Sequence, residues 1–290
     1  MKTNTFKNSQ DFRKSLEVRL QRTAKEKGID LQRLRRQVAF DRLLARFFTQ
    51  PETPFFLKGG YAMELRLSTA RATKDIDLTY LQRVKNQDDS LSALILNDLQ
   101  QLASINLDDY FSYALGEAQL DLDNAPYGGA RYPVSSFIDG KMFVRFHLDV
   151  GGDILTSSTE TVTTPDWLNF CGISAPTVKT ISIEQQFAEK IHAYTLPRGD
   201  RLNSRVKDLV DIMLLKEMRS LDLEKLSINL QKVFKIRSTH ALPLQLPAPP
   251  SEWIEPYSAL ANECGLEQNL SLAFQEITSF YSKLAKNAST

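Results

Sequence analysis

Hydrophobic and polar positions divide the chain into a helical start, a strand-rich middle and a helical second half. Near the start, Phe12, Leu16 and Leu20 recur four residues apart, which predicts an amphipathic helix. A second helix is expected after Asp30, which is a suitable N-cap residue. The prolines of the segment TQPETP, residues 49–54, then end that helix because proline does not continue one.

The middle of the chain predicts a small sheet. Residues 74–80 alternate between apolar and polar side chains, which is typical of a half-buried strand. Asp139-Gly140 is a strong signal for a two-residue hairpin between two further strands. The strands are expected at residues 55–58, 74–80, 110–122, 130–138 and 141–150, with a helix at 88–106.

The second half of the chain predicts helices joined by a proline-rich segment. That segment, residues 243–256, is expected to be extended, with Trp253 as an anchor. The fold class is therefore α+β: a small mixed sheet flanked by helices, followed by a helical C-terminal half. We expect two domains, residues 1–165 with the N-terminal helices and the sheet, and residues 166–290 with the later helices. Those helices are expected at 184–194, 204–218, 222–235 and 258–286.

Composition narrows the class of protein. The chain has 290 residues, of which 42% are hydrophobic and 24% charged, as in ordinary globular proteins. No apolar run approaches the ~18 residues that a membrane span needs, and no secretory signal is recognisable at the N-terminus. Only Cys171 and Cys264 are present, which excludes a disulfide scaffold and favours the reducing cytoplasm.

The net charge of +1 hides an asymmetry. Residues 1–50 carry 13 Lys and Arg against 5 Asp and Glu, a net charge of +8, and the other 240 residues have a net charge of −7. A basic N-terminal region is compatible with a polyanionic partner such as RNA. The other interpretation is a solvated helix surface. The arginines that would contact RNA phosphates are Arg33, Arg35, Arg36 and Arg42.

Three acidic residues are candidates for a metal site. Asp75 and Asp77 lie two apart on a predicted strand, so both carboxylates point to the same face. Two neighbouring carboxylates either shift a pKa upward or bind a cation, and Mg²⁺ prefers such oxygen ligands. Asp149 would complete a site of three carboxylates if its strand pairs beside the first. The alternative is that all three are exposed surface acids.

The segment Lys58-Gly59-Gly60 lies between a predicted strand and a predicted helix. Paired glycines allow backbone N–H groups to approach an anion, and the start of a helix favours negative charge. The alternative is an ordinary tight turn between a strand and a helix.

Taken in order, these motifs resemble a known family. KGGYAMELRLSTARATKDIDL, residues 58–78, resembles the segment that marks the AbiEii/AbiGii-type nucleotidyltransferase toxins, and FHLDVGGD carries the third acid of that superfamily. Later family motifs have counterparts at Lys190 in EQQFAEKIHA and in RVKDLVDIMLL. The latter supplies Arg205, Lys207, Asp208 and Asp211. Fourteen residues separate Gly60 from Asp75, a spacing that is long for the superfamily but typical of this branch.

The resemblance implies a nucleotidyltransferase that uses a nucleoside triphosphate and Mg²⁺. Asp75, Asp77 and Asp149 would hold the metal, and Asp149 could instead be the base for the acceptor hydroxyl. The nucleotide and its leaving pyrophosphate would contact Lys58, Gly59, Gly60, Arg71, Lys190, Asp208 and Asp211. Asp208 and Asp211 would orient Lys190 or bind the base and ribose; locally, Lys190 could equally be a solvated helix lysine and the later motif a surface salt-bridge helix.

The resemblance also implies a biological role. The protein would be the cytoplasmic toxin of a bacterial toxin–antitoxin or abortive-infection system, with a cognate antitoxin and with RNA, most simply the 3′ end of tRNA, as acceptor. Two alternatives remain open. One is an enzyme of the same core that modifies a small molecule or a protein hydroxyl, and the other is a non-catalytic binding module of the same fold.

Overall fold

A computed structural model describes residues 6–81, 91–121, 126–199, 203–218 and 220–287. The chain forms two compact units, each built from several segments. The first unit consists of Met1–Leu65, Ala72–Ile154 and Thr161–Thr180, and the second of Arg66–Arg71, Leu155–Glu160 and Ile181–Thr290. The predicted division into two domains, residues 1–165 and 166–290, stays a prediction.

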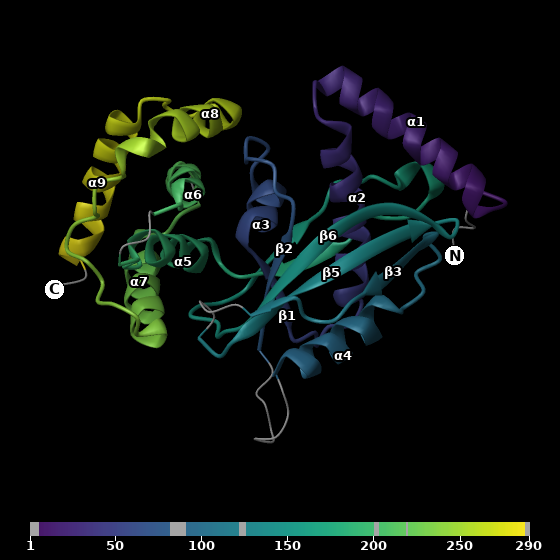
Figure 1. Ribbon diagram of the computed structural model, residues 1–290, viewed down its shortest axis with the longest axis horizontal. Coiled ribbons are helices and arrows are strands. Elements are labelled where there is room, and N and C mark those ends of the chain that lie inside the picture. Colours follow the sequence, from purple (N-terminus) through teal and green to yellow (C-terminus); the bar gives the residue numbers. More distant parts are fainter. Residues whose placement is uncertain (1–5, 82–90, 122–125, 200–202, 219, 288–290) are drawn as a thin grey trace. The chain divides into compact units, whose positions relative to one another are not determined.

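Three helices of the first unit pack on its sheet. They are α1 (Ser9–Lys27), α2 (Leu31–Phe47) and α4 (Leu91–Ala103) (Figure 1). Phe12, Leu16 and Leu20 are buried, as the four-residue spacing of α1 predicts. The Asp30 side chain accepts a hydrogen bond from the backbone N–H of Arg33, which confirms the predicted N-cap of α2.

One mixed sheet forms the centre of the first unit. Among the described residues its strand order is β3-β5-β6-β2-β1-β8-β7, with β4 beside β5. The strands are β1 (Phe55–Lys58), β2 (Ile76–Tyr80), β3 (Phe111–Leu115), β4 (Leu120–Asp121), β5 (Gly129–Ile138), β6 (Lys141–Gly152), β7 (Glu160–Thr163) and β8 (Thr177–Thr180). Each predicted strand is found, although the run expected at 110–122 is divided between β3 and β4.

The two faces of this sheet differ in polarity. Ile76 and Leu78 on β2 and Leu148 on β6 are fully buried in the core that the helices of this unit cover. Asp77, between Ile76 and Leu78, and Asp149, next to Leu148, therefore point to the opposite face. β2 runs antiparallel to β1 and parallel to β6, so it places polar side chains from three strands side by side.

The β5–β6 hairpin contains a β-bulge that the sequence does not predict. Its turn is the predicted one, because Asp139 and Gly140 both have positive φ, 58° and 64°, as a two-residue turn of this kind requires. A bulge then shifts the register between Ser136 and Phe137, so that two strand residues oppose one. Beyond the bulge, each residue of β5 pairs one position further along β6 than the turn alone would give.

The second unit is helical, as predicted. Its helices are α5 (Ile183–Thr195), α6 (Val206–Lys216), α7 (Leu223–Arg237), α8 (Ile254–Cys264) and α9 (Leu270–Asn287). In the proline-rich segment, Trp253 is buried and its Nε1–H donates to the carbonyl oxygen of Asn203 at 2.7 Å. The expectation of an extended chain as far as residue 256 is wrong at its end, because α8 already begins at Ile254. Proline is tolerated in the first turn of a helix, where its missing N–H has no helical partner.

The helices and the two cysteines can be compared with the expectations from composition. No helix in the described ranges combines the length and the apolar character that crossing a bilayer would take. Cys171 and Cys264 are both buried free thiols, in agreement with the absence of a disulfide scaffold.

Candidate active site

Two of the three predicted carboxylates lie on adjacent strands of the first unit, and Asp75 directly precedes one of them, because β2 begins at Ile76 and not at residue 74. Asp77 on β2 is the register partner of Asp149 on the parallel strand β6. Asp75 precedes Asp77 by two residues and therefore shares its face of the sheet. The pairing on which the three-carboxylate site depends is thus present. The side chains are partly accessible, with 32% of Asp75 and 16% of Asp149 exposed.

An arginine that sequence reasoning missed lies among these acids. Arg131 on β5 donates from Nε and Nη2 to the two carboxylate oxygens of Asp149, both at 2.7 Å. Its Nη2 also lies 3.7 Å from Oδ2 of Asp75. The hydrogen bonds to Asp149, together with the charges of all three aspartates, raise the pKa of Arg131 above its usual range. The only sequence signal was its place on the polar face of a predicted strand.

A histidine also contacts the cluster. His147 lies two residues before Asp149 on β6, and its Nδ1 is 3.3 Å from Oδ1 of Asp75. The alternation of the strand predicts that His147 and Asp149 share a face, and the structure bears this out. Its ring therefore lies beside one of the predicted metal ligands.

The Gly59-Gly60 turn lies directly against Asp77. Lys58 is the register partner of Asp77, and α3 (Gly59–Arg66) begins at the next residue. Gly59 has φ of 66°, and a Cβ atom at this position would lie 2.0 Å from Oδ2 of Asp77. Only glycine can therefore occupy this turn without moving the carboxylate. The Lys58 ammonium lies 3.6 Å from the Asp153 carboxylate, so this predicted nucleotide contact has an acidic neighbour.

The chemistry of these donors can be compared with that of Mg²⁺. Carboxylates from neighbouring strands supply the oxygen donors that Mg²⁺ prefers. Three carboxylates also concentrate negative charge, and the folded chain already places one cation, the guanidinium of Arg131, among them. Within the described part of the chain, no group of three or more Asp, Glu, His or Cys side chains is preassembled for metal binding. The residues fit the ion in donor type and charge, with two donor oxygens held by Arg131.

The second unit contains the other predicted site residues in one ion-pair cluster. The Lys190 ammonium lies 2.8 Å from Oδ1 of Asp208 and 2.8 Å from Oδ2 of Asp211. Arg71 donates from Nε and Nη2 to the two oxygens of Asp211, both at 2.8 Å. The two aspartates therefore share a face of α6 and both contact Lys190, and it stays a prediction that they orient Lys190 or bind the base and ribose.

The two aspartates of this cluster are more deeply buried than the acids of the first unit, whereas Lys190 is as exposed as Asp149. The exposed fractions are 16% for the Lys190 side chain, 7% for Asp208 and 1% for Asp211. Burial would by itself raise the pKa of Asp211, but Lys190 and Arg71 outweigh it and the pKa is lowered. Burial would likewise lower the pKa of Lys190, yet the two aspartates raise it. The alternatives of a solvated Lys190 and of surface acids at Asp208 and Asp211 are therefore wrong, whereas Lys207 is exposed and Arg205 forms an accessible pair with Asp208.

One atom of this cluster keeps an unused acceptor. Oδ2 of Asp208 is buried and accepts no hydrogen bond from the described residues. The Nη1 of Arg205 lies 3.6 Å away, which is an ion pair without a hydrogen bond. A buried acceptor without a hydrogen bond is uncommon in folded proteins, so this oxygen is suited to a donor group of a bound molecule.

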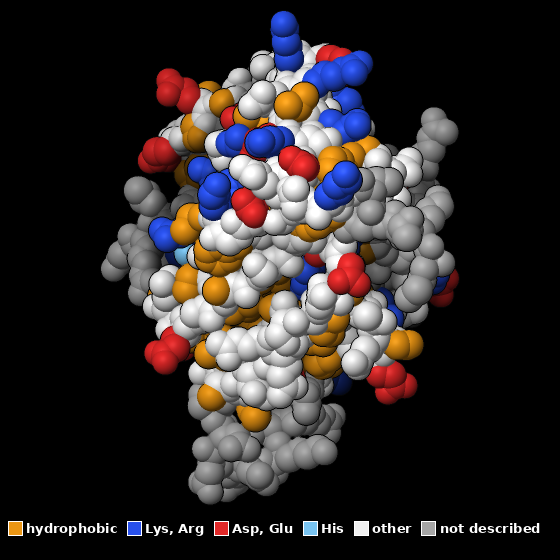
Figure 2. All heavy atoms as spheres, turned by 90° about the vertical axis from the view of Figure 1, so that its right-hand side faces the viewer, with side chains coloured by type: hydrophobic (Ala, Val, Ile, Leu, Met, Phe, Trp, Pro, Cys, Tyr) orange, Lys and Arg blue, Asp and Glu red, His pale blue; other side chains and the backbone are white. Residues whose placement is uncertain are grey.

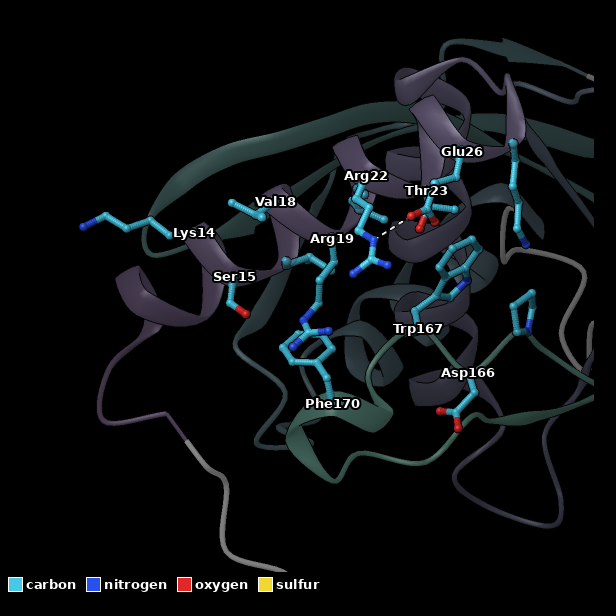
Figure 3. Close-up of a pocket in the computed structure, with 14 residues that line it drawn as sticks. Lys14, Ser15, Val18, Arg19, Arg22, Thr23, Glu26, Asp166, Trp167 and Phe170 are labelled. Carbon is cyan, nitrogen blue, oxygen red and sulfur yellow. Dashed lines mark hydrogen bonds and ion pairs between the residues drawn. The ribbon is translucent and has the colours of Figure 1, made fainter.

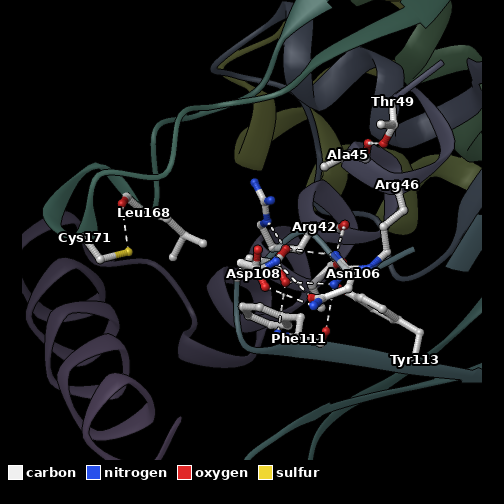
Figure 4. A network of polar contacts seen from close by, with 12 residues as sticks. Arg42, Ala45, Arg46, Thr49, Asn106, Asp108, Phe111, Tyr113, Leu168 and Cys171 are labelled. Carbon is white, nitrogen blue, oxygen red and sulfur yellow. Dashed lines mark hydrogen bonds and ion pairs between the residues drawn. The ribbon is translucent and has the colours of Figure 1, made fainter. Parts of the chain in front are cut away.

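Most of the arginines that were predicted to contact RNA form ion pairs with acidic side chains of the same unit. Arg33 pairs with Glu64 at 3.0 Å, and Arg35 pairs with Glu17 at 2.7 Å. Arg42 is buried, and its Nε donates to Asp109 at 2.7 Å. Figure 4 shows Arg42 within this network of polar contacts. An RNA contact by Arg42 is thus a wrong expectation, because its guanidinium balances a buried carboxylate.

The exposed cations of this region lie instead on α1. Lys and Arg side chains gather toward the upper end of the face shown in Figure 2. A hollow of about 900 Å³ runs along α1 and the segment that carries Trp167 and Phe170 (Figure 3). Its charges are mixed, because Arg22 pairs with Glu26 and the Arg19 guanidinium lies 4.3 Å from the centre of the Phe170 ring.

The sequence and the fold were each compared with those of known proteins. The sequence matches the family model described as "Nucleotidyl transferase AbiEii toxin, Type IV TA system" over residues 42–280. The fold is similar to that of MenT4, a nucleotidyltransferase toxin from Mycobacterium tuberculosis H37Rv. The TM-score is 0.56 at 14% identity, over 94% of this chain and 98% of that chain. JHP933 from Helicobacter pylori aligns with a TM-score of 0.45 and 14% identity, over 88% of this chain and 94% of that chain. No curated protein matches the sequence. The predicted α+β fold class is confirmed.

Proposed function

Because the chain belongs to the AbiEii family of nucleotidyl transferase toxins of type IV toxin–antitoxin systems, we propose that it transfers a nucleoside monophosphate to RNA, with tRNA as the acceptor. The donor is a nucleoside triphosphate, and the reaction requires Mg²⁺. A cognate antitoxin counteracts the toxin in the cytoplasm. The similar fold of MenT4, a nucleotidyltransferase toxin, agrees with this assignment.

The observation that carries the proposal is the register of β2 and β6. It puts Asp77 beside Asp149, with Asp75 on the same face and the Gly59 turn against Asp77. β2 and β6 hold Asp77 and Asp149, Asp75 directly precedes β2, and Gly59 begins α3, so regular elements position the site, as catalysis requires. An excess of carboxylates next to a glycine turn at the start of a helix combines a cation site with a site for phosphate oxygens.

The reaction assigns a task to each group. The acceptor hydroxyl oxygen forms a bond to the α-phosphorus, the bond to the bridging oxygen breaks, and pyrophosphate leaves. Mg²⁺ held by Asp75, Asp77 and Asp149 would neutralise charge on the attacking and leaving oxygens. The backbone at Gly59 and Gly60 binds phosphate oxygens. The hydroxyl proton passes to a carboxylate of this cluster, Asp149 or Asp75.

The second unit supplies the remaining candidates. We assign Lys190 to the handling of the triphosphate, as the family resemblance implies. The free oxygen of Asp208 is suited to accept a hydrogen bond from a ribose hydroxyl or a base amino group. Arg71 and Asp211 hold the lysine in position through their ion pairs.

The test is an incubation of the full chain with total RNA and each of four α-labelled nucleoside triphosphates, with Mg²⁺ or with a chelator. The proposal expects label in RNA only with Mg²⁺, and none with the Asp77→Asn variant. Label in a small molecule or in protein would replace RNA as the acceptor. If no triphosphate gives label in any fraction, the chain is a binding module and the proposal fails.

A further inference from the structure

A second hollow of the first unit lies beside the acid cluster. It has a volume of about 680 Å³ and includes Asp75 in its lining. β2 pairs with β6 only from Leu148 onward, so among the described strands none covers that side of β6 before this residue. The hollow lies at this uncovered stretch. Its charged lining consists of Arg36, Lys74, Asp75, Arg131, Arg145 and His147.

Three cations of this hollow have no internal partner. Within the described residues, Arg36, Lys74 and Arg145 make no hydrogen bond or ion pair through their charged groups, and the Nε of Arg36 is buried without an acceptor. The neighbouring arginines on α2 differ, since Arg33 and Arg35 each pair with a glutamate. The fold therefore neutralises these neighbouring arginines and leaves the three cations of the hollow available.

We propose that this hollow binds the phosphate groups of the RNA acceptor and so brings its terminal hydroxyl to Asp75. This inference rests on the proposed function, because it concerns the acceptor of that reaction. Unpaired cations along a groove are the feature by which proteins bind single-stranded nucleic acid without reading its sequence. Arg131 and His147 belong both to the hollow and to the acid cluster, so the two are continuous.

The larger hollow along α1 fits a polyanion less well. Glu26 and Asp166 contribute carboxylates to its lining, and Arg22 is paired with Glu26. Arg19 is placed over the Phe170 ring, which then offers less of its face to a base (Figure 3). It is therefore a suitable control surface, with exposed cations of the same type in the same unit.

The test measures RNA binding without nucleotide or metal. Fluorescence anisotropy of a short labelled single-stranded RNA is recorded across a series of salt concentrations. The variant R36Q/K74Q/R145Q should flatten the slope of log affinity against log salt by about 2, since each single-strand phosphate contact contributes about 0.7. At 0.1 M salt this corresponds to about 100-fold weaker binding. The control variant K14Q/R19Q/K27Q should keep the wild-type slope.

Several outcomes decide the matter. A wild-type slope in R36Q/K74Q/R145Q, or an equal loss in the control variant, overturns the inference. If circular dichroism shows that Arg36→Gln unfolds the protein, K74Q/R145Q replaces the triple variant and should flatten the slope by about 1.4. If polyglutamate binds the wild type as tightly as RNA does, the hollow is a site for an acidic polypeptide and the inference is wrong.

The failure of this inference differs from the failure of the proposed function. RNA binding that depends on the hollow, without nucleotide incorporation by the wild type, contradicts the proposed reaction and keeps the RNA site. Incorporation into RNA by the wild type, with unchanged RNA binding by the triple variant, contradicts the RNA site and keeps the proposed reaction.

Discussion

The acid cluster of the first unit and the ion-pair cluster of the second contain the same kinds of side chain in different balance. In the first unit, the Arg131 guanidinium lies among the carboxylates of Asp75, Asp77 and Asp149. In the second, the carboxylates of Asp208 and Asp211 face Lys190 and Arg71. About a third of the Asp75 side chain is exposed, whereas Asp211 is almost fully buried.

From this difference we infer that the acid cluster serves the reaction, whereas the ion-pair cluster also stabilises the second unit. Several carboxylates gathered at a partly accessible face repel one another and attract a further cation, so the removal of one need not harm folding. A buried and balanced set has no such surplus, and the loss of one partner leaves a buried charge uncompensated. The first cluster should therefore respond to substitution in activity, and the second in stability as well.

The largest expected effect is on the reaction itself. Asp77→Asn should reduce nucleotide transfer by about 1,000-fold or more, since the charge stabilisation that a metal ligand supports is worth several kcal/mol. Asp75→Asn should behave in the same way. Because both changes relieve repulsion, the melting temperature should stay constant or rise. Transfer rates and thermal melts of the same preparations test this, and a wild-type rate in either variant would refute the metal site.

Lys190→Ala should affect stability to a degree that the acid variants do not. Removal of one partner of a buried pair costs about 3–5 kcal/mol of the free energy of unfolding. Denaturant titration measures this, with Lys225→Ala as a control, because Lys225 is largely exposed. Equal stability of the two variants would mean that the cluster does not hold the second unit together. Nucleotide affinity, measured well below the melting temperature, then tests the role of Lys190 in triphosphate handling.

Gly59→Ala should show how closely the turn and the first cluster are coupled. The added Cβ atom would collide with Asp77, and the positive φ adds about 1–2 kcal/mol of backbone strain. Gly28→Ala is a matched control, since Gly28 has φ of 65° with nothing within 4 Å of the added atom. Both variants should lose stability to a similar extent from strain, but only Gly59→Ala should lose transfer activity. Activity retained in Gly59→Ala would show that Asp77 can move without consequence.

The smallest effect is expected where a salt bridge is accessible. Arg35→Gln removes a pair with Glu17 in which each side chain is about one-fifth exposed. A pair of this exposure lies between a solvated pair, which contributes about 0–1 kcal/mol, and a buried one, so a loss of about 1 kcal/mol is expected. A shift of the unfolding midpoint of this size, with the RNA salt slope unchanged, would confirm that Arg35 serves α1 and α2 only. A reduced slope would place RNA phosphates at Arg35 and extend the proposed RNA surface along α2.

Local spacing in the sequence determined much of this protein. Period-two alternation was sufficient to put Asp75 and Asp77 on one face, because a strand turns successive side chains to opposite sides. Four-residue spacing identified α1, and Asp139-Gly140 identified the hairpin. The order of the motifs also led to the family, because the glycine pair, the acids and Lys190 follow one another along the chain.

Only the tertiary structure decided which charged groups meet. Without the bulge near Phe137, the hairpin turn would have placed Arg131 opposite Leu148, whereas the shifted register places it beside Asp149. Lys190 has the local sequence of a solvated helix lysine, yet packing buries it between two aspartates. Backbone geometry sets spacing within one element, but register and burial depend on segments far apart in sequence. For this reason the acids of the first unit were predictable, and the pairing of Asp149 with Arg131 was not.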